Sequence, residues 1–108
     1  MALPLNVFKT VALDVPGTAT EIYTAPTGYT AIVLLSQVCN TDTIPQTVSF
    51  FHKRGSTSTA LVFDYEIPAS ETLVLTSGRL VLETGDKLEL SGSDTELKFV
   101  ASVLETLK

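Results

Sequence analysis

Residues 22–40 read IYTAPTGYTAIVLLSQVCN, and this stretch decides the fold of the chain. It begins with a short β-type segment, turns at Pro26-Thr27-Gly28, and continues into a long run of β-branched, aromatic and aliphatic residues. Proline presets φ and glycine accepts a positive φ, so the turn has a physical basis. The long run suits a pleated, buried strand.

Both faces of this long predicted strand are apolar at its middle. Strict alternation places Ala31, Val33 and Leu35 on one face and Ile32, Leu34 and Val38 on the other. A strand of an antiparallel sheet commonly shows one face to the core and the other to water. The second apolar face therefore predicts cover by a second sheet, by a neighbouring subunit, or by both.

The rest of the chain divides into short alternating segments. Strands are predicted over residues 5–13, 19–24, 29–40, 46–53, 60–67, 72–76, 80–83, 87–90 and 96–104. Turn signals recur about every 8–12 residues, with no helical segment between them. This spacing predicts an all-β fold: an antiparallel two-sheet β-sandwich, jelly-roll-like, of seven to nine strands.

Two details of this prediction concern the later strands. The alternation in residues 60–67 places Leu61, Phe63, Tyr65 and Ile67 toward the core. Residues 99–107 also fit the apolar stripe of a helix, which is the rival interpretation of the last strand.

The composition agrees with a single domain, residues 1–108, that needs no disulfide. The chain is 44% hydrophobic and has one cysteine, so no intrachain disulfide is possible. The net charge of −5 argues against nucleic acid as a direct partner, because phosphate binding needs clustered Lys and Arg. The N-terminal MALPLNVFKT lacks the early positive charge of a signal peptide. No apolar run approaches the roughly 18 residues of a membrane-spanning helix, so we expect no membrane partner.

Residues that usually carry catalysis are few and scattered. The single histidine, His52, and the single thiol, Cys39, are expected to lie far apart if residues 29–40 and 46–53 form a hairpin. One His and one Cys cannot make a zinc site, and no G-x-S-x-G nucleophile motif is present. The acidic turns at residues 84–86 and 93–96 do not have the spacing of an EF-hand. We expect no enzyme activity, no cofactor and no metal.

Several motifs resemble small virion structural proteins of tailed bacteriophages, including those of cyanobacterial phages. The matching residues are Tyr23-Thr24-Ala25-Pro26-Thr27-Gly28, Asn40, Ile67-Pro68-Ala69, the LETGDKL of residues 82–88, and Val100-Ala101-Ser102 with Glu105. The resemblance covers nearly the whole chain. It implies a non-enzymatic virion component, assembled in the host cytoplasm, that decorates or cements the capsid or sits at the neck or tail. It assigns no binding residues.

The surplus of apolar strand surface predicts a subunit interface. Its candidate residues are Ala31, Val33, Leu35, Phe51, Val100 and Leu104. If their strands are neighbours, these residues form an outer patch larger than a soluble monomer normally exposes. Such a patch fits a symmetric homo-oligomer or a contact with other virion proteins. The alternative is that a loop or the N-terminal segment covers it.

Two other function classes stay open. A receptor- or glycan-binding module of a fibre or baseplate would present an exposed aromatic or polar cluster in one set of loops, and the loops at residues 41–45 and 55–59 carry no aromatic residue. A small enzyme of the cupin type would need several histidines for its metal, and the chain has one. The sequence therefore favours a structural role.

Overall fold

A computed structural model describes residues 5–108 of the protein, and this part contains nine strands and no helix. The strands are β1 Asn6–Asp14, β2 Thr20–Thr24, β3 Tyr29–Asn40, β4 Gln46–Arg54, β5 Thr57–Ile67, β6 Thr72–Val74, β7 Leu80–Leu82, β8 Lys87–Gly92 and β9 Leu97–Leu107. All nine predicted segments are strands. The helical interpretation of residues 99–107 is wrong, because β9 runs through them. The expectation of no signal peptide depends partly on residues 1–4, which lie outside the described residues.

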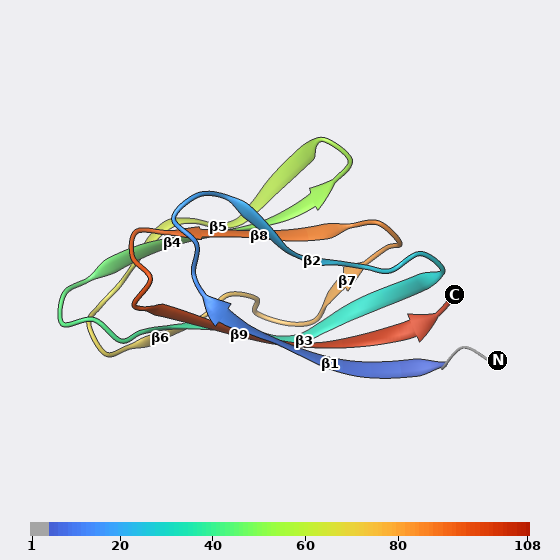
Figure 1. Ribbon diagram of the computed structural model, residues 1–108, viewed down its shortest axis with the longest axis horizontal. Helices are drawn as coiled ribbons and strands as arrows, with labels where there is room; N and C mark the ends of the chain where they lie inside the picture. The colour runs from blue at the N-terminus through green and yellow to red at the C-terminus, as the bar shows by residue number, and fades with distance from the viewer. Residues whose placement is uncertain (1–4) are drawn as a thin grey trace.

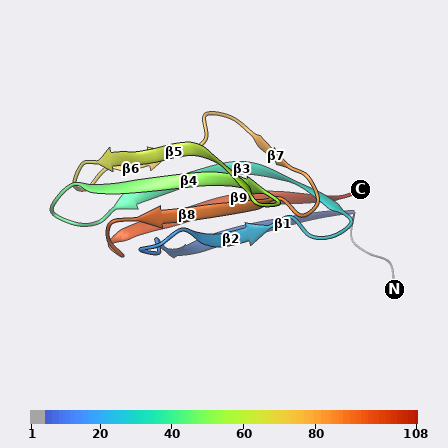
Figure 2. The ribbon, with the colours of Figure 1, turned by 90° about the horizontal axis from the view of Figure 1, so that it is seen from above.

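The strands form two antiparallel sheets packed face to face (Figure 1). The five-stranded sheet has the order β1-β9-β3-β6, and β7 pairs with the same edge of β3 as β6 does. The four-stranded sheet has the order β2-β8-β4-β5. Seen from above, β2, β8, β4 and β5 overlie β1, β9, β3 and β6 in that order (Figure 2). Except at β4–β5 and β6–β7, consecutive strands belong to opposite sheets, which is the arrangement of a jelly roll. The predicted fold class is confirmed.

The core fills the space between the sheets with one face of each strand. Phe50 and Phe99, one from each sheet, are fully buried with ring centroids 5.9 Å apart. In β9 the buried residues include Leu97, Ala101 and Val103, as the alternation predicts. Burying a large apolar side chain contributes about 1.5–3 kcal/mol each, so these contacts are the main stabilising force.

A β-bulge in β3 changes which of its residues face the core. The pairing with β9 shifts between Val33 and Leu35, which leaves Leu34 as the extra residue. The buried positions are therefore Ala31 and Val33 before the bulge and Ser36, Val38 and Asn40 after it. Strict alternation was wrong for this strand: Val38 shares the core face with Val33, and Leu35 faces outward.

The prediction for the inward face of β5 is also wrong in most positions. Leu61, Phe63 and Tyr65 are exposed, and only Ile67 of the four is buried. The pairing of β5 with β4 shifts twice, and Asp64, beside one shift, has a φ of 44°, in the left-handed region. Because these irregularities rotate the strand, Val62 packs against the core instead. The tip of the β4–β5 hairpin rises away from the five-stranded sheet (Figure 1).

Asn40, the last residue of β3, joins the loops at one end of the sandwich. Its side-chain amide donates hydrogen bonds to the carbonyl oxygens of Ile44 at 3.0 Å and Ile67 at 2.9 Å. Its side-chain oxygen accepts a hydrogen bond from the backbone N–H of Asp42 at 2.9 Å. Asn40 is fully buried, so these bonds satisfy a polar group that would otherwise destabilise the core.

Candidate functional site

The outer face of the five-stranded sheet carries a row of apolar side chains that crosses four strands. The strand registers place Phe8 of β1 opposite Leu104 of β9. They place Ile32 of β3 between Leu104 and Val81 of β7. Phe8 is 74% exposed and Val81 is 54% exposed, whereas Leu104 and Ile32 are half-buried. We call Phe8, Leu104, Ile32 and Val81 the large row.

Two further rows continue this face along the strands. The middle row consists of Thr10, Ser102 and Leu35, paired across β1, β9 and β3. The bulge places Leu34 beside it, and the two leucines are 39% and 40% exposed. The small row consists of Ala12, Val100, Gln37 and Val74. We call the three rows together the outer apolar face.

The outer apolar face is nearly free of charge in an acidic protein. Among the described residues that the registers place on this side of the sheet, only Asp14 and Lys98 are ionised. They form an ion pair, with 3.0 Å between Lys98 Nζ and Asp14 Oδ1. The net charge of the chain is −5, so the acidic surplus lies elsewhere. A second acidic protein surface meets the least electrostatic repulsion on this face.

The six predicted interface residues separate into three groups. Leu35, Val100 and Leu104 lie on the outer apolar face. Ala31 and Val33 are fully buried in the core, so their assignment to an interface is wrong. The bulge separates them from Leu35, because the extra residue Leu34 puts Leu35 on the opposite face of the sheet.

Phe51, the remaining predicted interface residue, lies on the outer face of the opposite sheet. It belongs to β4, which pairs with β8 and β5 rather than with β9. The single patch expected from the sequence is therefore split between two sheets. Sequence reasoning missed Phe8 as a surface residue, although the alternation in residues 5–13 already separated it from Val7 and Val11.

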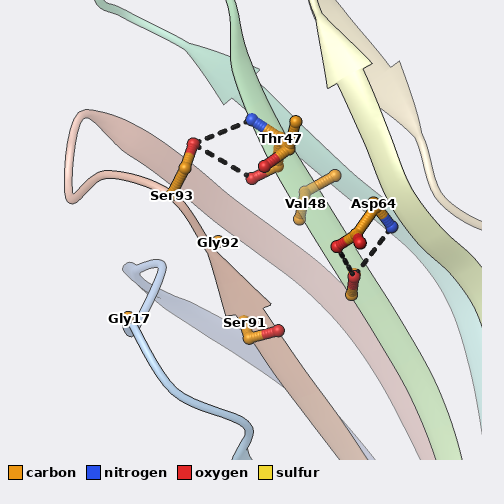
Figure 3. Close-up of a pocket in the computed structure, with 8 residues that line it drawn as sticks. Gly17, Thr47, Val48, Asp64, Ser91, Gly92 and Ser93 are labelled. Atoms are coloured by element: carbon orange, nitrogen blue, oxygen red, sulfur yellow. Dashed lines mark hydrogen bonds between the residues drawn. The ribbon is translucent and has the colours of Figure 1, made fainter.

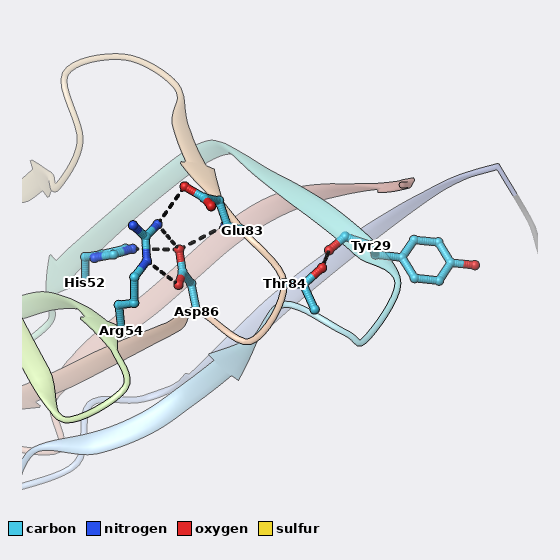
Figure 4. A network of polar contacts seen from close by, with 6 residues as sticks. All are labelled: Tyr29, His52, Arg54, Glu83, Thr84 and Asp86. Atoms are coloured by element: carbon cyan, nitrogen blue, oxygen red, sulfur yellow. Dashed lines mark hydrogen bonds and ion pairs between the residues drawn. The ribbon is translucent and has the colours of Figure 1, made fainter.

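A polar cluster closes the sandwich where the turn between β7 and β8 meets β4 (Figure 4). The carboxylate of Asp86 accepts hydrogen bonds from Arg54 Nε at 2.8 Å, Arg54 Nη2 at 2.7 Å and the backbone N–H of Glu83 at 2.9 Å. The ring of His52 lies 3.0 Å away through Nε2. The hydrogen bonds from Arg54 hold the pKa of Asp86 well below its usual range. These partners occupy the lone pairs of the carboxylate, so the cluster anchors the turn rather than serving as a catalytic base.

The only histidine and the only thiol lie in different sheets. The hairpin assumed for residues 29–53 does not form, because β3 and β4 belong to opposite sheets. Cys39 has Lys98 and Thr72 as its cross-strand neighbours, whereas His52 contacts Asp86. In residues 5–108, no group of three or more His, Cys, Asp or Glu side chains is placed to hold a metal ion. In the same part of the chain, no helix is long and apolar enough to cross a membrane.

A buried carboxylate links the two sheets. Glu105 of β9 is 3% exposed and accepts a hydrogen bond of 2.5 Å from the hydroxyl of Tyr23 in β2. Lys9 Nζ of β1 lies 3.2 Å from the same carboxylate. Burial, together with the hydrogen bond to Glu105, raises the pKa of Tyr23 above its ordinary value, so the phenol stays a donor. Glu105 is one of the motif residues on which the sequence resemblance is based, and that resemblance gave it no role. In the structure, its hydrogen bond to Tyr23 joins β9 to β2.

A polar depression lies on the outer face of the four-stranded sheet (Figure 3). It has a volume of about 190 Å³ and is lined by Gly17, Thr47, Val48, Ser49, Asp64, Ser91, Gly92 and Ser93. The Ser49 hydroxyl donates to Asp64 Oδ1 at 3.2 Å. Phe63, which directly precedes Asp64 and is 68% exposed, packs edge-on against Phe51 with ring centroids 6.4 Å apart. Hydroxyls, a carboxylate, the exposed ring of Phe63 and the half-buried ring of Phe51 are therefore neighbours on this side.

Comparisons with known proteins find similar folds in solved structures. A chain of the T13 IBDV viral particle matches with a TM-score of 0.55 and 12% identity, over 96% of this chain and 31% of that one. This chain thus spans about a third of the length of the viral protein that it matches. A subunit of Bacillus endospore appendages, described as disulfide-linked pili, matches with a TM-score of 0.51 and 19% identity, over 99% of this chain and 93% of that one.

A pentameric capsid protein from metagenomic phage sequences matches with a TM-score of 0.45 and 18% identity, over 90% of this chain and 60% of that one. No protein-family model and no curated protein sequence matches the chain. At these identities the similarities concern the fold alone, and that fold occurs in a viral particle and in a pilus.

Proposed function

We propose that the chain is a non-enzymatic structural subunit of a tailed-phage virion that acts by protein–protein contact. The observation that carries the proposal is the outer apolar face, which leaves Phe8, Val74 and Val81 each more than half exposed. Soluble monomers rarely expose a contiguous apolar surface of this kind, and such surfaces mark interaction sites. The occurrence of the same fold in a viral particle and a pilus supports a role in assembly. The resemblance of the sequence motifs supports the phage.

Within the virion, the proposed places are those of a capsid decoration or cement protein, or of a neck or tail accessory component. The partners are further copies of the chain, other virion proteins, or both, in a particle assembled in the host cytoplasm. The acidic balance agrees with this proposal, because an acidic surface does not attract packaged nucleic acid. The anchored state of Asp86 and Glu105 gives these carboxylates a structural task rather than a chemical one.

The experiment compares two phenylalanines on opposite sides of the sandwich. Phe8 on the outer apolar face and Phe63 on the four-stranded sheet are 74% and 68% exposed, so Phe8→Asp and Phe63→Asp are matched in chemistry and exposure. Particles purified from the virus that encodes the chain should contain the parent protein and the Phe63→Asp variant in equal amounts. The Phe8→Asp variant should be depleted at least tenfold. Absence of the parent protein from the particles would contradict the proposal, and so would equal incorporation of both variants.

The polar depression favours a second candidate, a receptor- or glycan-binding module of a fibre or baseplate. Its hydroxyls and the Asp64 carboxylate can hydrogen-bond sugar hydroxyl groups, and the exposed ring of Phe63 can stack on the apolar side of a sugar. A glycan array tests this candidate, with Ser91→Ala and Phe63→Ala as variants that should lose any signal. Retention of the same glycan signal by both variants would exclude the depression as the binding site.

A further inference from the structure

We propose that the outer apolar face pairs with the same face of a second copy of the chain, about a two-fold axis that runs along the middle row. The inference rests on the proposed function and specifies the partner and the geometry of its contact. The axis lies in the plane of the contact, crosses the strands, and passes along Thr10, Ser102 and Leu35. Each middle-row residue therefore meets its own equivalent, as an isologous interface requires.

This rotation reverses the strand direction and keeps the strand order. β9 of one copy lies over β9 of the second copy, and β1 over β1. The large row of one copy therefore covers the small row of the other: Leu104 lies over Val100 of the second copy, and Phe8 lies over Ala12. Leu104 and Phe8 thus meet smaller side chains on each side of the axis, while Ile32 lies over Gln37 and Val81 over Val74.

Side-chain size separates this arrangement from the other two-fold arrangement of the same face. An axis parallel to the strands, between β9 and β3, would place Leu104 over Ile32 of the second copy and Ala12 over Val74. Large side chains would then meet large ones, and small ones would face a gap. Protein interfaces pack as densely as protein interiors, so the arrangement that alternates large and small side chains is favoured.

The charges at the edge of the face agree with the same axis. The ion pair of Asp14 and Lys98 lies at one end of the face along the strands, and the neutral pair of Asn6 and Thr106 lies at the other end. The rotation brings the charged pair over the neutral pair, so no like charges meet. The remaining acidic residues of each copy lie away from the contact, which limits the repulsion between two chains of net charge −5.

The size of the face is sufficient for a specific contact. Three strands of about nine residues, together with the three-residue strands β6 and β7, at about 4.8 Å spacing and about 3.3 Å per residue give a flat projection of roughly 520 Å², with the polar pairs at both ends included. The accessible surface of a corrugated face is larger than its projection, which brings it near the ~800 Å² per partner of a standard interface.

Chemical cross-linking tests the position of the axis. Thr10→Cys and Thr106→Cys are each made in a Cys39→Ser background and treated with a short bismaleimide, since facing sheets lie about 10 Å apart. Thr10 lies on the proposed axis, so Thr10→Cys should give a covalent dimer. Thr106 lies four residues from Ser102, which separates it from its own equivalent by roughly 26 Å along the strands, so Thr106→Cys should stay monomeric. An axis parallel to the strands predicts the opposite result for the two variants, and that result would overturn the proposal.

A charge pair placed across the axis gives an independent test. Val100→Lys and Leu104→Glu should each weaken dimerisation at least tenfold, because each places a charge against an apolar side chain of the second copy. The double variant should recover most of this loss, since each introduced lysine then faces an introduced glutamate. The parallel axis places these residues over Gln37 and Ile32 instead, and predicts no recovery.

The two proposals fail differently. The geometry would be overturned, while the assembly role stands, by one combination of results. In that case the parent protein dimerises, the Phe8→Asp variant does not, and the double variant shows no recovery. A parent protein that stays monomeric at every concentration, and is absent from particles, would overturn both.

Discussion

Replacing Asp86 with asparagine should destabilise the protein through the turn between β7 and β8. Asparagine keeps one oxygen, and Oδ2 is the one that accepts from the backbone N–H of Glu83 and contacts His52 Nε2. The amide NH2 then takes the place of Oδ1 and meets the Nε–H of Arg54, donor against donor. Asp86 is 2% exposed, so this amide stays unsatisfied, and the remaining hydrogen bonds lose the charge of the carboxylate.

The expected total loss for Asp86→Asn is therefore about 2–3 kcal/mol at neutral pH, or a fall in Tm on the order of 10 °C. Urea unfolding followed by circular dichroism measures it. Glu83→Gln is the matched control: Glu83 meets Arg54 only at the exposed end of the cluster, so that variant should stay within about 0.5 kcal/mol of the parent.

The stabilisation that Asp86 provides should depend on pH. The pKa of Asp86 is lower in the folded than in the unfolded protein, so its stabilisation is complete above pH ~4 and decreases as the pH falls from there toward the folded-state pKa. The difference between the parent and Asp86→Asn should consequently shrink by about 1 kcal/mol between pH 4 and pH 3. Equal losses in Asp86→Asn and Glu83→Gln, or a difference that does not change over this range, would refute the assignment of Asp86 as the anchor of the turn.

Three further outcomes follow from burial and contacts. Phe50→Ala should cost about 3–5 kcal/mol of unfolding free energy and Phe63→Ala less than about 0.5 kcal/mol, and similar losses in both would mean that the faces of β4 and β5 are assigned wrongly. Gly92→Ala should lower the free energy of unfolding by about 1–3 kcal/mol, because a Cβ there would lie 2.7 and 2.8 Å from two side-chain atoms. Gly78→Ala should be nearly neutral, because the space around Gly78 is open. A Gly92→Ala variant as stable as the parent would show that the site can expand. Cys39→Ser should leave the mass of the protein in solution unchanged with or without reductant, and a dependence on reductant would indicate an intermolecular disulfide.

The positions of the strands could be predicted from the sequence because turn chemistry is local. Pro26 and Gly28 end β2 and start β3 through their own backbone preferences, whatever lies elsewhere in the fold. The same holds for Gly85, whose φ of 87° closes the turn before β8. Long strands with these boundaries leave few arrangements other than a sandwich.

The faces of the strands were predicted less well because they depend on pairing between distant segments. Leu34 is an extra residue only in relation to its partner strand β9, and nothing in the apolar run around it marks the bulge. The irregularity at Asp64 has a similar effect in β5 and puts Phe63 on the outer face. A single extra residue moves the side chains beyond it to the other face, so the register shifts in β3 and β5 account for most of the wrong assignments.

The candidate surface was half predicted for the same reason. Val100 and Leu104 follow from simple alternation in β9, which has no bulge of its own. Phe8 and Val81 belong to the same surface only because β1 lies beside β9 and β7 lies beside β3 in the sheet. These strands are not neighbours in the sequence, so alternation alone could not predict this. Glu105 likewise finds its partners, which are Tyr23 and Lys9, on strands that are more than 80 positions away in the sequence.

The mass of the protein in solution tests the central claim most directly. Sedimentation equilibrium over a wide concentration range should show the parent chain and Phe63→Asp as multiples of the 11.6 kDa monomer, and Phe8→Asp as the monomer, with all three folded by circular dichroism. A parent protein that remains at 11.6 kDa throughout, or a Phe8→Asp variant that associates as the parent does, would contradict assembly through the outer apolar face.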